Sequence, residues 1–179
     1  MVPIEKFTDV DFGNCKVLFK NERELKDVCF FASHTILPFI PYYVFYNLEV
    51  IKRTNFTIVF VSSSPICEND IVRLSRCADI IIEKENRGTD FGAWCAVLRW
   101  LNYGKEFQNL YLCNDSVFGL FESFENINKR FQIIENDLLG ITDSHQSGGY
   151  HILKFFFCVL FYKKRKNGKI FSKKEKIFK

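Results

Sequence analysis

Four short apolar runs, separated by stretches with helical patterning, constrain the fold of this chain more than any other feature. The runs occupy residues 28–33, 56–61, 78–83 and 110–113. Each is mainly apolar rather than alternating, which is typical of strands buried on both faces of a parallel sheet. We therefore expect an α/β fold, with a mostly parallel central sheet and helices on both of its faces.

The stretches between these runs predict the remaining elements. Helices are expected at residues 22–26, 41–52, 68–77 and 123–134, a further helix begins near residue 89, and another strand is expected at residues 138–142. Proline is tolerated in a first helical turn, which places the start of one helix near Pro41. In the helix after residue 89, Trp94, Val97, Leu98 and Leu101 share one face and should pack on the sheet.

Length and composition indicate one folded domain. The chain has 179 residues, 47% of them hydrophobic, which excludes a wholly disordered protein. We divide it into a lead-in segment (residues 1–27), an α/β domain (28–162) and a Lys-rich tail (163–179). The tail holds nine of the 25 basic residues and one of the 21 acidic residues, so the rest of the chain is mildly acidic.

The cysteines and the apolar runs indicate the cellular compartment of the protein. Seven cysteines form no C-x-x-C pair and no zinc-like cluster, which fits a reducing compartment. The amino terminus has no signal-peptide pattern, and the longest apolar run, residues 152–162, is shorter than the roughly 20 residues that span a membrane. We expect a soluble cytoplasmic protein.

Polar residues follow all four buried runs, at residues 33–34, 62–64, 86–90 and 114–116. The carboxyl ends of parallel strands meet at one edge of a sheet, where open α/β folds bind their ligands. His34 is one candidate ligand-binding residue at this edge. A loop histidine bonded to backbone is the simpler alternative.

Residues 86–94 join the third run to the helix that follows it. Gly88 suits a tight turn, and the free N–H groups of the new helix favour an anion. Arg87 has a planar fork that matches a phosphate, although a solvent-facing arginine is at least as simple. The alternative for the whole corner is a turn at Gly88 with Asp90 capping the helix, and no ligand.

Asn114, Asp115 and Ser116 follow the fourth run. A carboxylate at this position is suited to hold Mg²⁺ or Mn²⁺ against a diphosphate, because these cations take oxygen ligands and are shared with phosphates. The alternative is a turn in which Asp115 caps the next segment. No P-loop, G-x-G-x-x-G, H-E-x-x-H or G-x-S-x-G motif is present.

Four blocks, in this order and spacing, resemble the bacterial rhamnan-synthesis family of glycosyltransferases, which help to build cell-wall polymers and lipopolysaccharide. They are NRGTDFGAW at 86–94, YLCNDSVFG at 111–119, LLGITDS at 138–144 and Tyr150-His151. The resemblance covers roughly residues 28–157. It implies a GT-A-like fold that takes a nucleotide-diphosphate sugar as donor and a glycan or lipid-linked glycan as acceptor.

The resemblance also implies roles for individual residues. Asp115 would hold the metal and the sugar diphosphate, together with its neighbours Asn114 and Ser116. The donor pocket would be lined by Asn86, Arg87, Gly88, Asp90 and His34. Asp143 and His151 are the candidates for activating the acceptor.

Two features depart from the family pattern. The usual acidic motif has two carboxylates, whereas Asp115 stands between Asn114 and Ser116. After His151 the sequence continues with Ile152-Leu153-Lys154 and the Lys-rich tail, where the family is expected to have a different sequence. Such a change is typical of a truncated or frame-shifted end. The alternative function is therefore a non-catalytic remnant or binding module that keeps only the donor-binding half.

The tail interleaves lysines with Ile170, Phe171, Ile177 and Phe178. Such a segment suits an anionic membrane surface, at about 1 kcal/mol per basic residue, and would hold the protein at the inner face of the cell membrane. A solvated tail is the alternative. Nucleic acid is not an expected partner, because the rest of the chain is acidic.

Overall fold

The computed structural model describes residues 13–101, 107–116, 126, 129, 138–140 and 160–163. In chain order the elements are β1 (Cys15–Lys20), β2 (Asp27–Ser33), α1 (Tyr42–Lys52), β3 (Thr57–Ser62), α2 (Glu68–Leu74), β4 (Ile80–Lys84), α3 (Thr89–Trp100), β5 (Asn109–Asn114), β6 (Leu138–Gly140) and β7 (Leu160–Lys163). The fold is therefore mixed α/β, as the sequence predicted.

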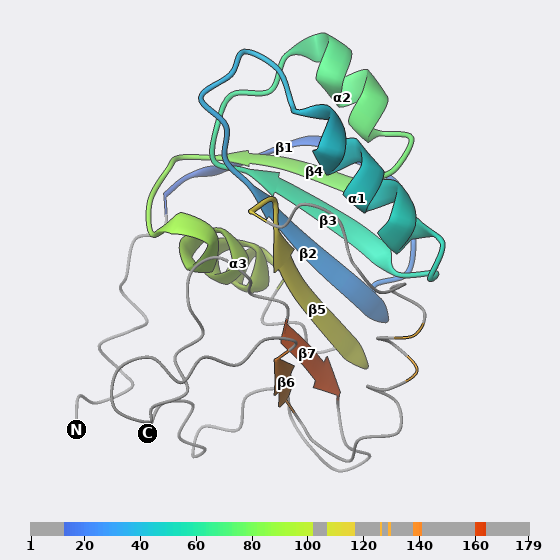
Figure 1. Cartoon of the computed structure of the whole chain (residues 1–179). Helices are drawn as coiled ribbons and strands as arrows, with labels where there is room; N and C mark the ends of the chain where they lie inside the picture. Colours follow the sequence, from blue (N-terminus) through green and yellow to red (C-terminus); the bar gives the residue numbers. More distant parts are fainter. Residues whose placement is uncertain are drawn as a thin grey trace, which may run out of the picture.

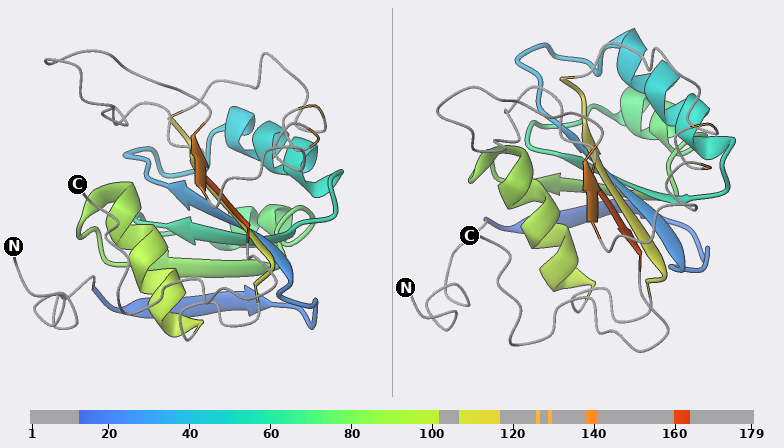
Figure 2. Two further views of the ribbon diagram at one scale, coloured as in Figure 1. Left: turned by 90° about the horizontal axis from the view of Figure 1, so that it is seen from below. Right: turned by 60° about the horizontal axis from the view of Figure 1, so that its bottom comes forward.

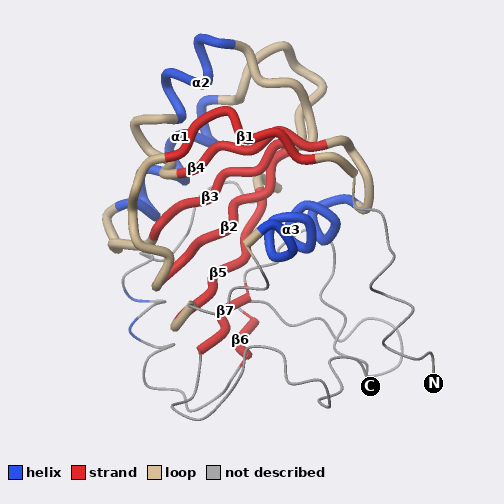
Figure 3. Tube along the Cα trace, turned by 180° about the vertical axis from the view of Figure 1, so that it is seen from behind, coloured by secondary structure: helices blue, strands red, loops and turns tan. Residues whose placement is uncertain are grey.

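The strands form one seven-stranded sheet in the order β1-β4-β3-β2-β5-β7-β6 (Figure 3). Its centre is parallel, because β4, β3, β2 and β5 run in the same direction. β1 pairs antiparallel with β4, and β7 pairs antiparallel with both β5 and β6. The chain moves outward from β2 through β3 to β4 and then returns to the other side of β2 as β5, so the strand order reverses between β2 and β5.

Helices cover both faces of the sheet. α1 and α2 lie on one face and α3 lies on the other (Figures 1 and 2). Successive residues of β2 point to opposite faces, so Cys29 and Phe31 pack with α1 and α2, while Val28, Phe30 and Ala32 pack with α3. Burying one such large apolar side chain contributes about 1.5–3 kcal/mol, which explains why these strands carry no polar face.

The four apolar runs form β2, β3, β4 and β5 with bounds shifted by at most two residues. The helix expected at residues 41–52 begins at Tyr42, directly after Pro41, and the helix expected at residues 68–77 ends at Leu74. Of the helix expected at residues 123–134, only positions 126 and 129 are described, and both are helical. β6 covers the first three residues of the strand expected at 138–142.

Two expectations were wrong. Residues 22–26 are irregular rather than helical, and the lead-in segment contains strand β1. β1 lies at the edge of the sheet with partly exposed side chains, so its sequence, CKVLFK, lacks the continuous apolar run of a central strand. β1 and β7 also make the two flanks of the sheet antiparallel, which the short apolar runs did not indicate.

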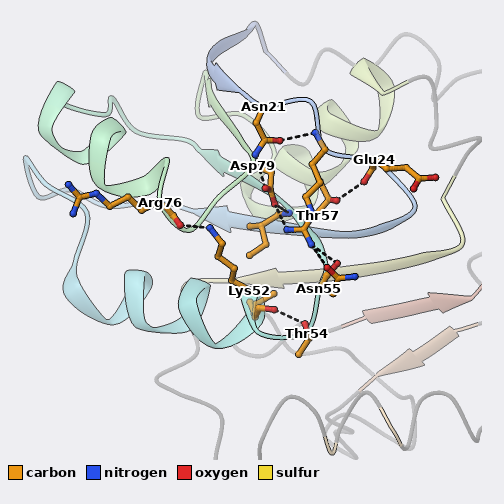
Figure 4. Close-up of polar contacts among 11 residues, drawn as sticks. Asn21, Glu24, Lys52, Thr54, Asn55, Thr57, Arg76 and Asp79 are labelled. Carbon is orange, nitrogen blue, oxygen red and sulfur yellow. Dashed lines mark hydrogen bonds and ion pairs between the residues drawn. The ribbon is translucent and has the colours of Figure 1, made fainter.

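The amino edge of the sheet is closed by a polar network around the buried Asp79, which directly precedes β4 (Figure 4). Its carboxylate accepts hydrogen bonds from Asn21 Nδ2 and Ile58 N, each at 2.8 Å, and pairs with Arg23 at 3.5 Å. Arg23 Nη2 also donates to Oδ1 of Asn55, at 2.6 Å. These contacts tie β1, β3 and β4 together where the chain enters the parallel strands.

Candidate functional site at the carboxyl edge

The carboxyl ends of β2 and β5 lie side by side, with Ala32 paired to Asn114, and Asp115 follows immediately. Asp115 Oδ2 accepts hydrogen bonds from Ser33 Oγ at 2.7 Å and from His34 N at 2.9 Å. The Asp115 N–H donates to Ala32 O at 3.0 Å. The carboxylate is thus fixed at the point where the strand order reverses, which is where open α/β sheets form a ligand-binding crevice.

Asp115 is only 8% exposed. Burial raises the pKa of its carboxyl group above the ordinary value, and the nearby Asp90 carboxylate raises the pKa further, while the hydrogen bonds from Ser33 and His34 lower it. The ion pairs found between described residues involve Asp79, Asp70 and Glu85 rather than Asp115. The corner therefore favours a ligand that brings positive charge or hydrogen-bond donors to Asp115.

Asn114 connects Asp115 to the start of α3. Its side-chain nitrogen donates to Asp90 Oδ2 at 2.7 Å, and because only the amide nitrogen can donate to a carboxylate, this bond fixes the orientation of the amide. Asn114 is 2% exposed, and its Oδ1 has no hydrogen-bond partner among the residues that the structure describes. A buried acceptor without a partner costs about 1–3 kcal/mol, a cost that a bound ligand or an ordered water would remove.

The corner between β4 and α3 has the turn that the sequence predicted. Gly88 is left-handed, with φ of 77°, and the β-branched Thr89 is also left-handed, with φ of 55°. The N-cap residue of α3 is Gly88, and Asp90 is the second residue of the helix. The alternative in which the Asp90 side chain caps the helix was therefore wrong, and this side chain accepts a hydrogen bond from Asn114 instead.

A buried lysine holds the loop that leads into this turn. Lys84 Nζ donates to the carbonyl of Glu85 at 2.5 Å and to the carbonyl of Arg87 at 2.9 Å. Burial lowers the pKa of Lys84. The half-exposed Arg87 side chain pairs with Glu85, its Nε lying 3.1 Å from Oε2, so a phosphate would have to compete with that carboxylate.

His34 has a defined tautomer. Ser64 Oγ lies 2.7 Å from Thr35 O, which can only accept, so the hydroxyl proton is used there. Ser64 Oγ also accepts from Thr35 N at 3.0 Å and lies 2.9 Å from His34 Nδ1. Nδ1 is therefore the donor to Ser64, and Nε2 of the neutral ring is left as an acceptor.

The structure brings together some of the residues that the sequence singled out. Asp115, Asn114, Asp90 and His34 are joined by the contacts above, and Ser116 is exposed next to Asp115. Asn86 and Arg87 lie on the exposed loop before Gly88. Asp143 and His151 lie outside the described residues.

Three polar residues contribute contacts that the sequence did not predict. Ser33 and Ser64 lie in the polar strand ends, but their partners depend on neighbouring strands that are distant in sequence. Lys84 was missed because it ends an apolar run, where a single lysine gives no sign of being buried.

The oxygen atoms of this corner fit a hard divalent cation. Asp115, Asp90 and the orphaned Oδ1 of Asn114 are the ligand type that Mg²⁺ and Mn²⁺ take, usually with one or two carboxylates and phosphate oxygens. Within the described part of the chain no three His, Cys, Asp or Glu residues cluster as a complete metal site. A cation here would therefore need further ligands from water or a bound molecule.

Fold and corner together define an α/β protein with a cluster of buried polar side chains at the strand-order reversal. A family model described as "Rhamnan synthesis protein F" matches residues 58–172, more than half of the chain. The chain belongs to this family. The matched range begins later than residue 28, where we expected the resemblance to start. It also continues past Ile152-Leu153-Lys154 into the Lys-rich tail, so it gives no support for a break in the family pattern there.

One curated relative is "Uncharacterized protein y4gN" of Sinorhizobium fredii (strain NBRC 101917 / NGR234). It is 26% identical over 118 residues, a stretch that covers 64% of this chain and 31% of the relative. The chain thus spans about a third of that protein's length. No solved structure was found to match the chain. No helix among the described residues is long and apolar enough to cross a membrane.

Proposed function

We propose that this chain is a GT-A-like glycosyltransferase domain, which moves a sugar from a nucleotide-diphosphate donor onto a growing cell-surface polysaccharide or lipopolysaccharide. The observation that carries the proposal is the unpartnered, buried Oδ1 of Asn114 beside the Asp115 carboxylate, at the point of strand-order reversal. Membership of the rhamnan-synthesis family supports sugar chemistry, with rhamnose as one candidate sugar.

In this proposal Asp115 and Asn114 bind the donor diphosphate through Mg²⁺ or Mn²⁺, with Asp90 holding Asn114 in place. The cation would supply positive charge to the diphosphate. Ser33 and the His34 N–H fix the Asp115 carboxylate, so its position is set before the donor arrives. The proposal assigns Asn86, Arg87, Gly88, Ser116 and His34 to the rest of the donor site.

The reaction exchanges one bond at the anomeric carbon of the donor. The acceptor hydroxyl oxygen forms the new glycosidic bond, and the bond to the diphosphate oxygen breaks, with its electron pair leaving on the diphosphate. The hydroxyl proton passes to a base, for which Asp143 and His151 remain the candidates. The acceptor is a glycan or lipid-linked glycan. In this proposal the protein is cytoplasmic and binds the acceptor at the inner face of the cell membrane.

Donor binding gives the direct test. Isothermal titration of the full chain with UDP- and dTDP-sugars in the presence of Mn²⁺ should show binding, and Asp115→Asn should weaken it by at least about tenfold, or roughly 1.4 kcal/mol. Asp27→Asn is the matched control, because Asp27 lies at the amino edge and bonds Asn109 there. Equal affinity in the wild type and Asp115→Asn would remove Asp115 from the donor site.

Turnover separates the proposed enzyme from a binding module. The single carboxylate in Asn114-Asp115-Ser116 favours the second candidate, a domain that holds a donor without transferring its sugar. Hydrolysis or transfer of the bound donor sugar supports the enzyme. Donor binding without any turnover supports the binding module, and absence of binding contradicts both.

A further inference from the structure

The segment that joins β2 to α1 and forms the first turns of that helix carries an exposed apolar surface at the periphery of the molecule (Figure 1). It holds five of the nine large apolar side chains that are exposed in the described part of the chain. These five are Ile36, Leu37, Phe39, Tyr42 and Tyr46, which are 44–94% exposed. Single exposed apolar residues are common on protein surfaces, whereas a contiguous group of them marks an interaction surface.

Hydrogen bonds anchor the backbone of this segment at both ends. At its start, Ser64 Oγ accepts from Thr35 N at 3.0 Å and donates to Thr35 O at 2.7 Å. Thr35 Oγ1 in turn accepts from Leu37 N at 3.0 Å. Further along, Ile40 N donates to the buried Asp70 carboxylate at 2.6 Å, and the Ile40 side chain is itself buried. The fold therefore presents the exposed apolar side chains from an anchored loop.

The chemistry of this segment suits a lipid surface. Residues 35–48 contain no charged side chain, so none has to be removed from water when the segment enters a bilayer surface. Interfaces between proteins, by contrast, are enriched in arginine and carry a polar rim. Tyr42 and Tyr46 lie one turn apart on α1, and their rings each combine an apolar body with a hydroxyl group. Such side chains are enriched where a membrane meets water.

The charge of the Lys-rich tail favours an anionic lipid surface over a protein partner. The tail, residues 163–179, has nine basic residues and one acidic residue. A single apolar anchor binds a membrane only marginally, whereas an apolar anchor combined with a polybasic segment binds it stably. The chain contains both of these signals, in residues 36–46 and in the tail.

We propose that residues 36–46 insert into the surface of an anionic bilayer, with the exposed apolar side chains of the loop among the lipid headgroups and upper acyl chains. His34, whose N–H bonds Asp115, lies two residues before this segment, so the bilayer would lie close to the donor corner. The inference rests on the proposed function where it names the acceptor: a lipid-linked glycan that the same bilayer carries.

The test measures how the full chain partitions onto vesicles of POPC and POPG by co-sedimentation. Ile36→Asp is the decisive variant, because Ile36 is 94% exposed and its replacement removes little packing within the fold. It should lower the partition coefficient at least about tenfold, since a lost apolar group and an added charge both oppose insertion. Val72→Asp is the matched control. Val72 is exposed on α2 and, two residues after Asp70, points away from the side that contacts Ile40.

High salt separates the segment from the tail. Added salt screens the attraction between the tail and the anionic lipid, so partition of the wild type should weaken. The difference between the wild type and Ile36→Asp should persist on vesicles of POPC alone, which carry no net charge.

Three results overturn the insertion: no partition of the wild type, equal partition of the wild type and Ile36→Asp, or an equal loss in Val72→Asp. Light scattering provides a fourth. A wild-type dimer that Ile36→Asp converts to a monomer would mean that a second copy of the chain covers the segment.

The donor-site proposal fails in a different way. A chain that binds nucleotide-sugar but no vesicles overturns only the membrane contact. A chain that binds vesicles through Ile36 but has no affinity for nucleotide-sugars overturns the proposed function and the lipid-linked acceptor, and leaves a membrane-binding segment.

Discussion

A buried aspartate lies at each of two edges of the sheet, and the two carboxylates differ in the charge of their neighbours. At the amino edge Asp79 receives two hydrogen bonds and an arginine, and at the carboxyl edge Asp115 receives two hydrogen bonds and faces a second carboxylate, Asp90. Beside Asp115 the amide oxygen of Asn114 has no hydrogen-bond partner within the described part of the chain. Buried polar groups are normally satisfied, so the contacts of the amino edge stabilise the fold, whereas the orphaned oxygen at the carboxyl edge supports the ligand site that we propose there.

Removing the Asp79 carboxylate should have the largest effect. Asp79→Ala leaves Asn21 Nδ2 and Ile58 N without their acceptor and Arg23 without its counter-ion, which should cost about 3 kcal/mol of the free energy of unfolding. Urea denaturation measures this loss. Asp115→Ala is the control from the other edge, and an equal loss there would contradict the division between a stabilising and a ligand-binding edge.

The left-handed turn at the carboxyl edge should give a smaller effect. Gly88 has φ of 77°, so Gly88→Ala should cost about 1 kcal/mol, because a Cβ disfavours this conformation. Gly88→Asn should cost less, since asparagine tolerates it; Asn55 adopts φ of 66° at the amino edge. Thermal unfolding of the two variants gives the order, and a larger loss for Asn than for Ala would show that backbone strain does not decide this position.

The central strands could be predicted because burial on both faces leaves a continuous apolar run, as in β2 and β3. β1 could not, because an edge strand with exposed side chains has no such run. The residues of the carboxyl edge were predictable for a similar reason: parallel strands bring their ends together whatever their exact register. The position of Asp115 thus follows from the pattern alone.

The contacts within that edge were not predictable, because they depend on register between distant segments. Asp115 meets Ser33 only because Ala32 pairs with Asn114. Whether Asp90 caps α3 or bonds Asn114 depends equally on where β5 ends. The orphaned oxygen of Asn114 follows from that choice, so the feature that most favours a ligand is visible only in the folded chain.

The pH dependence of stability should show the smallest difference between the edges. The pKa of Asp115 is raised in the folded chain, first by burial and then by Asp90, so between its unfolded and folded pKa the folded state binds more protons and stability falls as pH rises. Asp115→Asn removes this cost. Without ligand, the variant should be as stable as the wild type in acid and more stable near neutral pH, with the gap opening as pH passes through the raised pKa.

Urea titrations at a series of pH values, without nucleotide or divalent cation, measure this difference. Mn²⁺ together with a nucleotide-sugar should reverse the order, because a ligand that binds only the folded wild type stabilises it by mass action. The contrary result is a wild type that is more stable than Asp115→Asn at neutral pH without ligand. It would mean that groups within the fold already compensate the Asp115 charge, as they do for Asp79 at the amino edge.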